Sequence, residues 1–523
     1  MQRHAGLLSL FSYKTVVVLS MLGLTLTQSA CMSNTMPDLA EPLPAHWQHQ
    51  TTDTRERTTP DLQGWWKAFH APDLDALVEE SLAQNLTLAA AREHIQAARI
   101  ISKKNYSNFL PDLHFRTNDV PAPSATTSYL QADFDTTWEL GLFGKKEASQ
   151  QIVDGQLADV EAQAQMARVS LVAEVVRTWI QLRTAQQQVQ LFDQLIQQTQ
   201  QQYSLTAARV DLGLSPKSAL STIQGSLAQQ QKMQQAKQLE VEQTLQQLAL
   251  LQGRTSPNPA WATPTTQPVI GEFSVQTLPT DVIRIRPDIQ QAQANVLQAA
   301  GQFGTARAAR YPSINLSGSY IYSLLIIGHF RLHAFDDNTI GAVGPIIDLP
   351  LFDWGLRKSA ADARESELKA ATLSYRQTVL EAVNEVESSL AAVHAAKQQI
   401  DKQNEVIQST KQTLDARQTL IHLGLSSSLD GVDEQLAALQ AQIELSSMQM
   451  NHDLAYVAVY KALGGASLDT SASSSASSSA SSSASSSASL SKAANSEAKK
   501  DLAHSTQSFS TKSLSERQAR QGG

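Results

Sequence analysis

The stretch that decides the fold is RPDIQQAQANVLQAAGQFGTARAARYPSINLSGSYIY, residues 286–322. It begins as a helix, because Pro287 suits a first helical position, where its missing N–H would have no partner in any case. We expect the helix to run to about Arg310 and to stop at Tyr311 and Pro312, because proline cannot continue the hydrogen-bond pattern.

Beyond this proline, the hydrophobic period changes from 3.6 to 2. Ile314, Leu316, Tyr320 and Tyr322 alternate with Asn315, Ser317, Ser319 and Ile321. The alternation predicts a strand with one apolar face. A long helix that leads directly into such a strand is uncommon, and it indicates a chain that crosses from an aqueous compartment into a membrane barrel.

The same order of elements occurs earlier in the chain. Residues 82–108 have a helical pattern, residues 109–111 end it, and residues 112–118 alternate. Two landmarks recur after roughly two hundred residues: Leu142-Phe143-Gly144-Lys145 matches Leu351-Phe352 with Gly355, and Leu212-Gly213-Leu214-Ser215 matches Leu423-Gly424-Leu425-Ser426. The chain is therefore predicted to be an internal duplication. Each half contains a helix, a strand pair, a long helix, a tight turn and another long helix.

The first predicted strand pair, residues 112–139, has the clearer alternation. Acidic residues on its return strand share one side, namely Asp133, Asp135 and Glu139. An apolar outside and a charged inside fit a water-filled pore, so these three side chains are predicted to face its lumen. The alternative is an edge of a soluble β-sandwich. The position of two such hairpins between long helices favours the pore.

The second predicted strand pair, residues 313–350, is less regular. A loop is expected over 324–337 and a return strand over 340–349. Pro345 in the return strand indicates an edge or a bulge, because proline cannot donate to the hydrogen-bond ladder. The pattern leaves the register of this strand open.

The long helices carry a seven-residue hydrophobic repeat. Its members are Val379, Val386, Val393, Ile400, Ile407, Leu414 and Ile421 in the second half, and Leu182, Val189, Ile196 and Tyr203 in the first. Sustained heptads specify a left-handed supercoiled seam. A soluble coiled-coil rod would have the same repeat, but it would leave the strands unexplained.

Each pair of long helices is joined by a tight turn. Gly213 is expected to adopt the left-handed conformation that ends a helix. Ser215 is expected to cap the returning helix, with Pro216 as its first residue. In the second half, Gly424 and residues 426–428 repeat this arrangement.

The two ends of the chain differ from its middle. Residues 1–30 have a basic leader and an apolar core, which is typical of a secretory signal peptide. The lone cysteine, Cys31, follows directly and is predicted to become the lipidated first residue of an extended arm over 31–60. The alternative is ordinary cleavage nearby, with a free thiol at Cys31. Residues 467–523 are rich in Ser and Ala and are predicted to be disordered, because they have little apolar surface to bury.

Taken together, these features resemble the TolC-like outer-membrane factor family, in particular its lipoprotein (NodT-type) branch found with drug-efflux pumps. The motifs that carry the resemblance are Trp65-Trp66-Lys67-Ala68-Phe69, Trp138-Glu139-Leu140, Leu142-Phe143-Gly144, Arg286-Pro287-Asp288-Ile289, Ala309 to Pro312, Leu349-Pro350-Leu351-Phe352 and Lys461-Ala462-Leu463-Gly464-Gly465. They occur in order over about residues 60–466. The resemblance implies an outer-membrane efflux duct over residues 61–466, with repeats at about 61–265 and 275–466.

The fold implied by this resemblance is mainly α with a membrane β-barrel. Four strands are too few to close a barrel, since even small barrels need about eight. The resemblance implies a homotrimer with a twelve-strand barrel and a long α-helical barrel. It also implies a periplasmic adaptor and an inner-membrane pump of the resistance-nodulation-division or a similar kind as partners, with drugs or other toxic compounds as substrates. The duct would lie in the cell outer membrane, lipid-anchored and extending into the periplasm.

Two acidic residues, Asp430 and Asp433, follow the second tight turn about one helical turn apart. By resemblance, they match the aspartates that line the closed periplasmic aperture of this family. The alternative is that acidic residues favour a helix N-terminus. The matching positions of the first half, Ala219 and Thr222, carry no acid.

The composition points to no other class of function. The net charge of −8 gives no reason to expect nucleic-acid binding. The sequence has no metal-spaced set of His and Cys and no phosphate-binding glycine loop. We therefore predict that the chain is not an enzyme and has no cofactor besides diacylglycerol and an N-acyl chain on Cys31. Two alternatives remain open, a type I protein-secretion duct and a lipid-anchored structural coiled coil.

Overall fold

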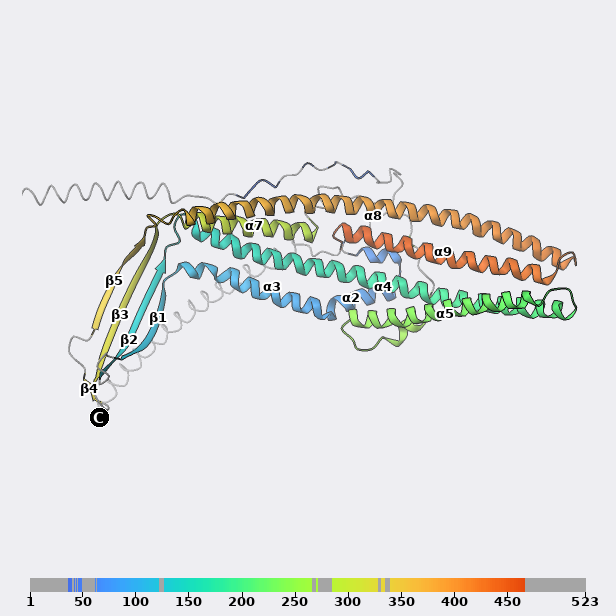
Figure 1. Ribbon diagram of the computed structural model, residues 1–523, viewed down its shortest axis with the longest axis horizontal. Coiled ribbons are helices and arrows are strands. Elements are labelled where there is room, and N and C mark those ends of the chain that lie inside the picture. Colours follow the sequence, from blue (N-terminus) through green and yellow to red (C-terminus); the bar gives the residue numbers. More distant parts are fainter. Residues whose placement is uncertain are drawn as a thin grey trace, which may run out of the picture. The chain divides into compact units, whose positions relative to one another are not determined.

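The computed structural model describes residues 64–121, 127–265, 285–327, 331–333 and 339–465, with short pieces at 36–39, 42, 44, 46–48, 62 and 270. The predicted signal peptide, Cys31, most of the arm and the tail beyond residue 466 lie outside the described residues. Helices dominate the described part, and its strands form a single sheet (Figure 1).

The first half contains these elements in order: η1 (Trp65–Phe69), α2 (Pro72–Gln84), α3 (Leu86–Lys104), η2 (Asn105–Phe109), β1 (Asp112–Pro121), β2 (Thr127–Glu139), α4 (Lys145–Asp211), α5 (Ser218–Leu251) and η3 (Pro259–Ala262). The prediction of a single helix over 82–108 is wrong. Asn85 interrupts it, because its extended backbone and its side chain cap the N-terminus of α3.

The second half contains α7 (Pro287–Ala308), β3 (Ser313–Ile327), β4 (Arg331–His333), β5 (Thr339–Asp348), α8 (Leu356–His422) and α9 (Ser428–Ala462). The structure confirms the helix that begins at Pro287 and the strand that follows Pro312. The loop expected over 324–337 is partly wrong, because β3 continues to Ile327 and pairs there with the short strand β4. The chain therefore has four long strands and one short one among its described residues.

The sheet is antiparallel, with β1 paired to β2, β2 to β3, and both β4 and β5 to β3. The structure supplies the register that the sequence left open, since Ser313 lies opposite Asp348 and Leu316 opposite Pro345. In the described part of the chain, β5 pairs only with β3. Pro345 thus sits in a strand that is paired on one side among the described residues, as the sequence predicted for proline.

The duplication is visible in the two longest helices. Both α4 and α8 have 67 residues, and each begins after a left-handed glycine, Gly144 at φ 80° and Gly355 at φ 82°. The residue before each glycine is also left-handed, Phe143 at φ 56° and Trp354 at φ 57°. The sequence match of Phe143 to Phe352 is therefore wrong by two positions, and Trp354 is its structural counterpart.

The helices pack in an order that follows the duplication. Helix α4 contacts α5, α7 and α9, and α8 contacts α9 and α7 (Figure 1). The predicted heptad residues of α4 and α8 are all buried or half-buried, which confirms the packed seam. Trp65 lies against Tyr456 and Tyr460 of α9, and Phe69 lies against Trp179 of α4, so the aromatic cluster near residue 65 is a packing element.

Within the described residues, no helix is both long enough and apolar enough to cross a bilayer.

Candidate functional site

The three acidic residues predicted to face a lumen lie on one face of the sheet. In the β1–β2 register, Asp133 lies opposite Arg116 and Asp135 opposite His114. Asp135 accepts a hydrogen bond from Ser319 Oγ at 2.7 Å, and its other oxygen lies 3.7 Å from the Arg116 guanidinium. Glu139 pairs with the ammonium of Lys145, at the point where the sheet leads into α4. On β1 and β2 this face is therefore polar, and its acidic residues outnumber its basic ones.

The opposite face of the sheet is apolar and exposed. Its exposed side chains are Leu113, Phe115, Phe134, Leu316, Tyr320, Val343 and Ile347. Phe115 and Phe134 are direct cross-strand neighbours with ring centroids 5.0 Å apart. On β1 and β2, the exposed large apolar side chains all lie on this face. On β5, Ile340 and Ile346 are also exposed, and they lie on the polar side. A continuous exposed apolar face requires a lipid or protein neighbour.

The first helical tip lies between α4 and α5. Gly213 has φ 71°, its N–H donates to the carbonyl of Val210, and Leu214 N–H donates to the carbonyl of Arg209. This is the predicted left-handed helix end. The predictions for Ser215 and Pro216 are both wrong: α5 begins at Ser218 after Lys217, and no side-chain hydrogen bond caps it.

The second tip, between α8 and α9, is better capped. Gly424 repeats the left-handed helix end at φ 72°. Ser427 caps α9, and Asp430 completes a capping box by accepting from the backbone N–H of Ser427 at 3.1 Å. A hydrogen bond from the Ser426 hydroxyl, followed by the bonds to Ser427, holds the pKa of Asp430 below its usual value.

The structure thus gives Asp430 and Asp433 different surroundings. Asp430 is half-buried by its capping contacts, whereas Asp433 is exposed and accepts one hydrogen bond from Gln202 Nε2 of α4 at 2.6 Å. The capping role of Asp430 differs from the helix-terminal charge and the gate residue that its position in the sequence predicts. The Ser-x-x-Asp pattern from Ser427 to Asp430 was the signal for the capping box.

A buried arginine that no sequence pattern predicts joins three segments of the first half. Arg183 of α4 is 3% exposed, and it donates to Asp73 at 2.8 Å and to the carbonyl of Thr263 at 2.9 Å. Burial raises the pKa of Asp73, but hydrogen bonds from Arg183 and Trp179 outweigh this effect and lower it overall. The cluster ties α2 and the segment after α5 to α4. Nothing in the sequence around this Arg, which lies within a Gln-rich helix, indicates that its partners are Asp73 and Thr263.

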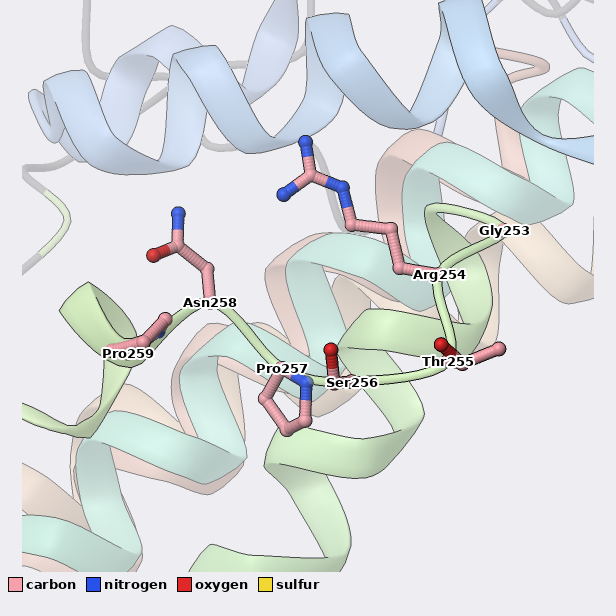
Figure 2. A pocket seen from close by; sticks show the side chains of 7 residues that line it. All are labelled: Gly253, Arg254, Thr255, Ser256, Pro257, Asn258 and Pro259. Atoms are coloured by element: carbon pink, nitrogen blue, oxygen red, sulfur yellow. The ribbon is translucent and has the colours of Figure 1, made fainter.

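A surface hollow lies along the loop after α5, lined by Gly253, Arg254, Thr255, Ser256, Pro257, Asn258 and Pro259 (Figure 2). Two of its polar side chains, Arg254 and Asn258, have local partners. Arg254 lies 3.4 Å from Glu80 of α2, and Asn258 caps the short helix η3. Among the described residues, no group of three or more His, Cys, Asp and Glu side chains is placed to hold a metal ion. The hollow is therefore part of a connection between helices.

The chain has two halves, and each contains an amphipathic strand pair between helices. A known protein family has the same two-part organisation. Residues 77–254 and 278–465 match the model described as "Outer membrane efflux protein". The chain belongs to this family. It is an outer-membrane efflux channel, and its fold is the family's, with long helical hairpins and a small set of antiparallel strands.

Curated relatives of this outer membrane efflux protein agree with the family match. The pyoverdine export outer membrane protein OpmQ of Pseudomonas putida is 25% identical over 466 residues, which cover 86% of this chain and 97% of the relative. The cation efflux system protein CusC of Escherichia coli is 26% identical over 409 residues, covering 77% and 88%. The toluene efflux pump outer membrane protein TtgC of Pseudomonas putida is 27% identical over 419 residues, covering 77% and 85%.

Solved structures of outer-membrane channels share the fold. The channel OprN matches with a TM-score of 0.71 at 23% identity, over 83% of this chain and 99% of that one. The open state of MtrE from Neisseria gonorrhoeae matches with a TM-score of 0.70 at 23% identity, over 83% and 98%.

Proposed function

We propose that this chain forms a passive exit duct as a homotrimer. The observation that carries the proposal is the sheet itself. Its polar face holds Asp133, Asp135 and Glu139, and its other face is exposed and apolar. Four long strands cannot enclose a pore, because closure takes about eight. Three copies would supply twelve long strands, with the polar face toward water and the apolar face toward lipid.

Within this proposal, the long helices extend the duct into the periplasm. At 1.5 Å per residue, a helix of 67 residues spans about 100 Å. In this proposal an inner-membrane pump of the resistance-nodulation-division or a similar kind supplies the energy through a periplasmic adaptor. The family match to efflux proteins supports this arrangement.

The substrates proposed are drugs or other toxic compounds. The names of the relatives refer to pyoverdine, cations and toluene. One duct architecture therefore serves chemically different cargo, which fits a passive channel whose pump makes the selection. The chain itself has no catalytic role in this proposal.

The proposal includes a lipid anchor at Cys31. The sequence pattern of a signal peptide that ends at the only cysteine supports it. Diacylglycerol on the sulfur and an acyl chain on the new amine would attach the N-terminus to the outer membrane. Mass spectrometry of the mature N-terminus tests this part, and an unmodified Cys31 or a different first residue would remove it.

The gate is proposed at the second helical tip. Three copies would bring Asp430 and Asp433 to one opening, where six carboxylates would repel one another and attract cations. The exposed position of Asp433 beside the second turn supports this assignment. The capping contacts of Asp430 show that it also has a role in holding the helix end.

An accumulation assay tests the exit function. Cells that lack this chain should retain more of at least one compound from a panel of dyes, antibiotics, solvents and metal cations, and the full-length chain should restore export. Unchanged retention across the whole panel would contradict the efflux function. A chain shortened after residue 466 should restore export as well as the full chain does, because the tail lies beyond both repeats.

A further inference from the structure

The three acidic residues on the polar face of β2 have different surroundings. Asp135 accepts a hydrogen bond from Ser319. Glu139 pairs with Lys145. Asp133 is only 8% exposed, and among the described residues its Oδ1 is buried without a hydrogen-bond partner. A buried carboxylate oxygen is costly when nothing donates to it, so Asp133 lacks a donor that the other two acids have.

The nearest basic side chain does not supply this donor. Arg116 lies directly opposite Asp133 in the β1–β2 register, but its guanidinium reaches diagonally to Asp135, 3.7 Å from Oδ2. The Arg116 side chain is 61% exposed. Because exposed ion pairs contribute little to stability, a ligand that approaches Asp133 can displace this side chain at low cost.

On its other side, Asp133 has two isoleucines as neighbours. In the antiparallel registers, Ile321 of β3 lies opposite Asp133, and Ile340 of β5 lies opposite Ile321; the three strands lie side by side (Figure 1). Directly opposite residues project from the same face of a sheet. Ile321 is half-buried and Ile340 is 64% exposed. The polar face therefore has, in one row across three strands, a carboxylate beside an apolar surface.

We propose that this row binds an organic cation with an apolar body, such as an arylammonium or alkylammonium ion that passes through the pore. The ammonium N–H groups donate to the carboxylate of Asp133, and the apolar body lies on Ile321 and Ile340. The proposal rests on the proposed function, because the row contacts cargo only if this face lines a pore. Transport stays passive, since binding to the wall supplies no energy.

The neighbouring rows of the same face lack this combination. Asp135 lies in a row with Ser319 and Ala342, where Ser319 Oγ already donates to it at 2.7 Å and the alanine offers little apolar surface. The row of Glu139 ends at Ile346, but Glu139 is already paired with a lysine. Only the row of Asp133, among those of the three acids, joins a carboxylate oxygen that lacks a donor to a large apolar side chain.

The chemistry of the row favours an organic cation over a metal ion. A divalent metal ion takes several oxygen ligands, and one carboxylate supplies too few. Among the described residues, no group of three or more His, Cys, Asp and Glu side chains could hold such an ion. Isoleucine side chains have no ligand atoms, but they gain free energy when apolar surface covers them. An ion with both a charged donor and an apolar body uses both parts of the row.

Three probes separate the two parts of the site. Benzylammonium has the charge and the ring, methylammonium has only the charge, and benzyl alcohol has only the ring. Saturation-transfer NMR on the full-length protein in lipid nanodiscs measures their binding, with the signal of empty nanodiscs subtracted. Benzylammonium should bind about tenfold more tightly than either other probe. Equal affinities for benzylammonium and benzyl alcohol would overturn the role of the carboxylate, and equal affinities for the two cations would overturn that of the isoleucines.

A matched pair of acid variants tests the position of the site. Asp133→Asn should weaken benzylammonium binding by about tenfold, because it removes the charge that the ammonium pairs with. Asp135→Asn removes the same charge two residues away on the same face and should weaken binding by less than about threefold. Equal losses in the two variants would show a diffuse attraction to the acidic face, and would overturn the site.

A matched set of isoleucine variants tests the apolar part. Ile321→Ser/Ile340→Ser should weaken benzylammonium binding by about fivefold and leave methylammonium binding unchanged. Ile346→Ser removes another exposed isoleucine of the same face and should leave both unchanged. A loss for methylammonium in the double variant would show that the substitutions disturb the sheet, and the apolar contact would then be wrong.

A variant with the opposite sign guards against a loss of binding that comes from misfolding. Arg116→Gln removes the cation nearest to Asp133 and should strengthen benzylammonium binding by about threefold, because the ligand no longer competes with a like charge. Unchanged or weaker binding in a trimer confirmed by native mass measurement would contradict the proposal.

The outcomes separate this proposal from the proposed function. If the wild-type trimer conducts ions but binds benzylammonium no better than empty nanodiscs do, the cation site is wrong and the duct stands. If the wild-type trimer binds benzylammonium but does not conduct, the duct is wrong, and the row is not a cargo site. Conductance together with binding that depends on Asp133 supports both.

Discussion

The two halves of the chain build the same joint with different chemistry. In the first half, Asn85 Nδ2 donates to the carbonyl of Leu251, at the end of α5, at 2.9 Å. In the second half, the guanidinium of Arg286 donates to the carbonyl of Ala462, at the end of α9. Each joint connects the start of the helix before the strands to the end of the last helix of its half.

The backbone of the two joints is alike. Gly253 and Gly464 follow the two helix ends with φ 71° and 75°. A Cβ added at Gly253 would lie 3.1 Å from the carbonyl oxygen of Gln84, and one at Gly464 would lie 3.4 Å from that of Ile285. Close backbone approach with positive φ requires glycine at both places. The duplication has therefore kept the geometry and changed the side chains.

The side chains differ in charge and in reach. Asn85 is neutral and also accepts from the backbone N–H of Leu88 at 3.1 Å, so it caps α3. Arg286 is buried and pairs with Asp288 at 2.6 Å and with Glu385 of α8 at 2.7 Å. The second joint thus fastens α7, α8 and α9 together, whereas the first fastens two helix ends. We expect the second joint to be the more sensitive to substitution.

The largest effect is expected from Arg286→Ala. It removes the cation that Asp288 and Glu385 share, and leaves the carbonyl of Ala462 without this donor. Breaking such a cluster costs about 3 kcal/mol of unfolding free energy, less than for a fully buried pair because both acids are partly exposed. Thermal unfolding in detergent, followed by helical circular dichroism, measures it. Arg254→Ala, which breaks an exposed pair with Glu80, is the matched control and should cost under about 1 kcal/mol.

A smaller effect is expected from Asn85→Ala, at about 1–2 kcal/mol, because it removes a helix cap and one hydrogen bond to Leu251. Asn85→Asp sharpens the test, since it retains the acceptor for Leu88 but lacks the donor to Leu251. The free energy of unfolding of Asn85→Asp should lie between those of the wild type and Asn85→Ala. If Asn85→Ala destabilised the protein as much as Arg286→Ala, the contrast between the two joints would be wrong.

The helical tips give the smallest expected difference in stability. Ser427→Ala removes the capping box of α9 and should cost about 1 kcal/mol. Ser215→Ala at the first tip removes no capping bond and should be near neutral. Hydrogen exchange of the first turns of α5 and α9 measures both. Faster exchange in α5 after Ser215→Ala would show that Ser215 has a role that the structure lacks.

Local patterns predicted the elements well, for physical reasons that the joints illustrate. Pro287 and Pro312 bound α7 and β3 because proline restricts its own backbone, and Gly213 and Gly424 end helices because they tolerate positive φ. Such signals act within a few residues. They placed Asp133 and Asp135 on one sheet face, because strand side chains alternate.

Long-range features could not be predicted in this way. The sequence pattern around Arg286 indicated a helix start, but nothing local indicates Glu385 as its partner. The register of β5 stayed open, because Gly341, Gly344 and Pro345 interrupt the alternation. The match of Phe143 to Trp354 needed backbone angles, since the residue types differ.

Single-channel recording of the purified full-length oligomer in planar bilayers tests the central claim most directly. We predict stepwise, cation-preferring conductance, and a loss of that preference in Asp430→Asn/Asp433→Asn. Asparagine removes both charges and keeps an acceptor oxygen for the capping contacts of Asp430, so α9 should remain capped. Absence of conductance from a confirmed trimer would contradict the duct. Unchanged ion preference and unchanged divalent-cation block in the double variant would contradict the gate at the second tip.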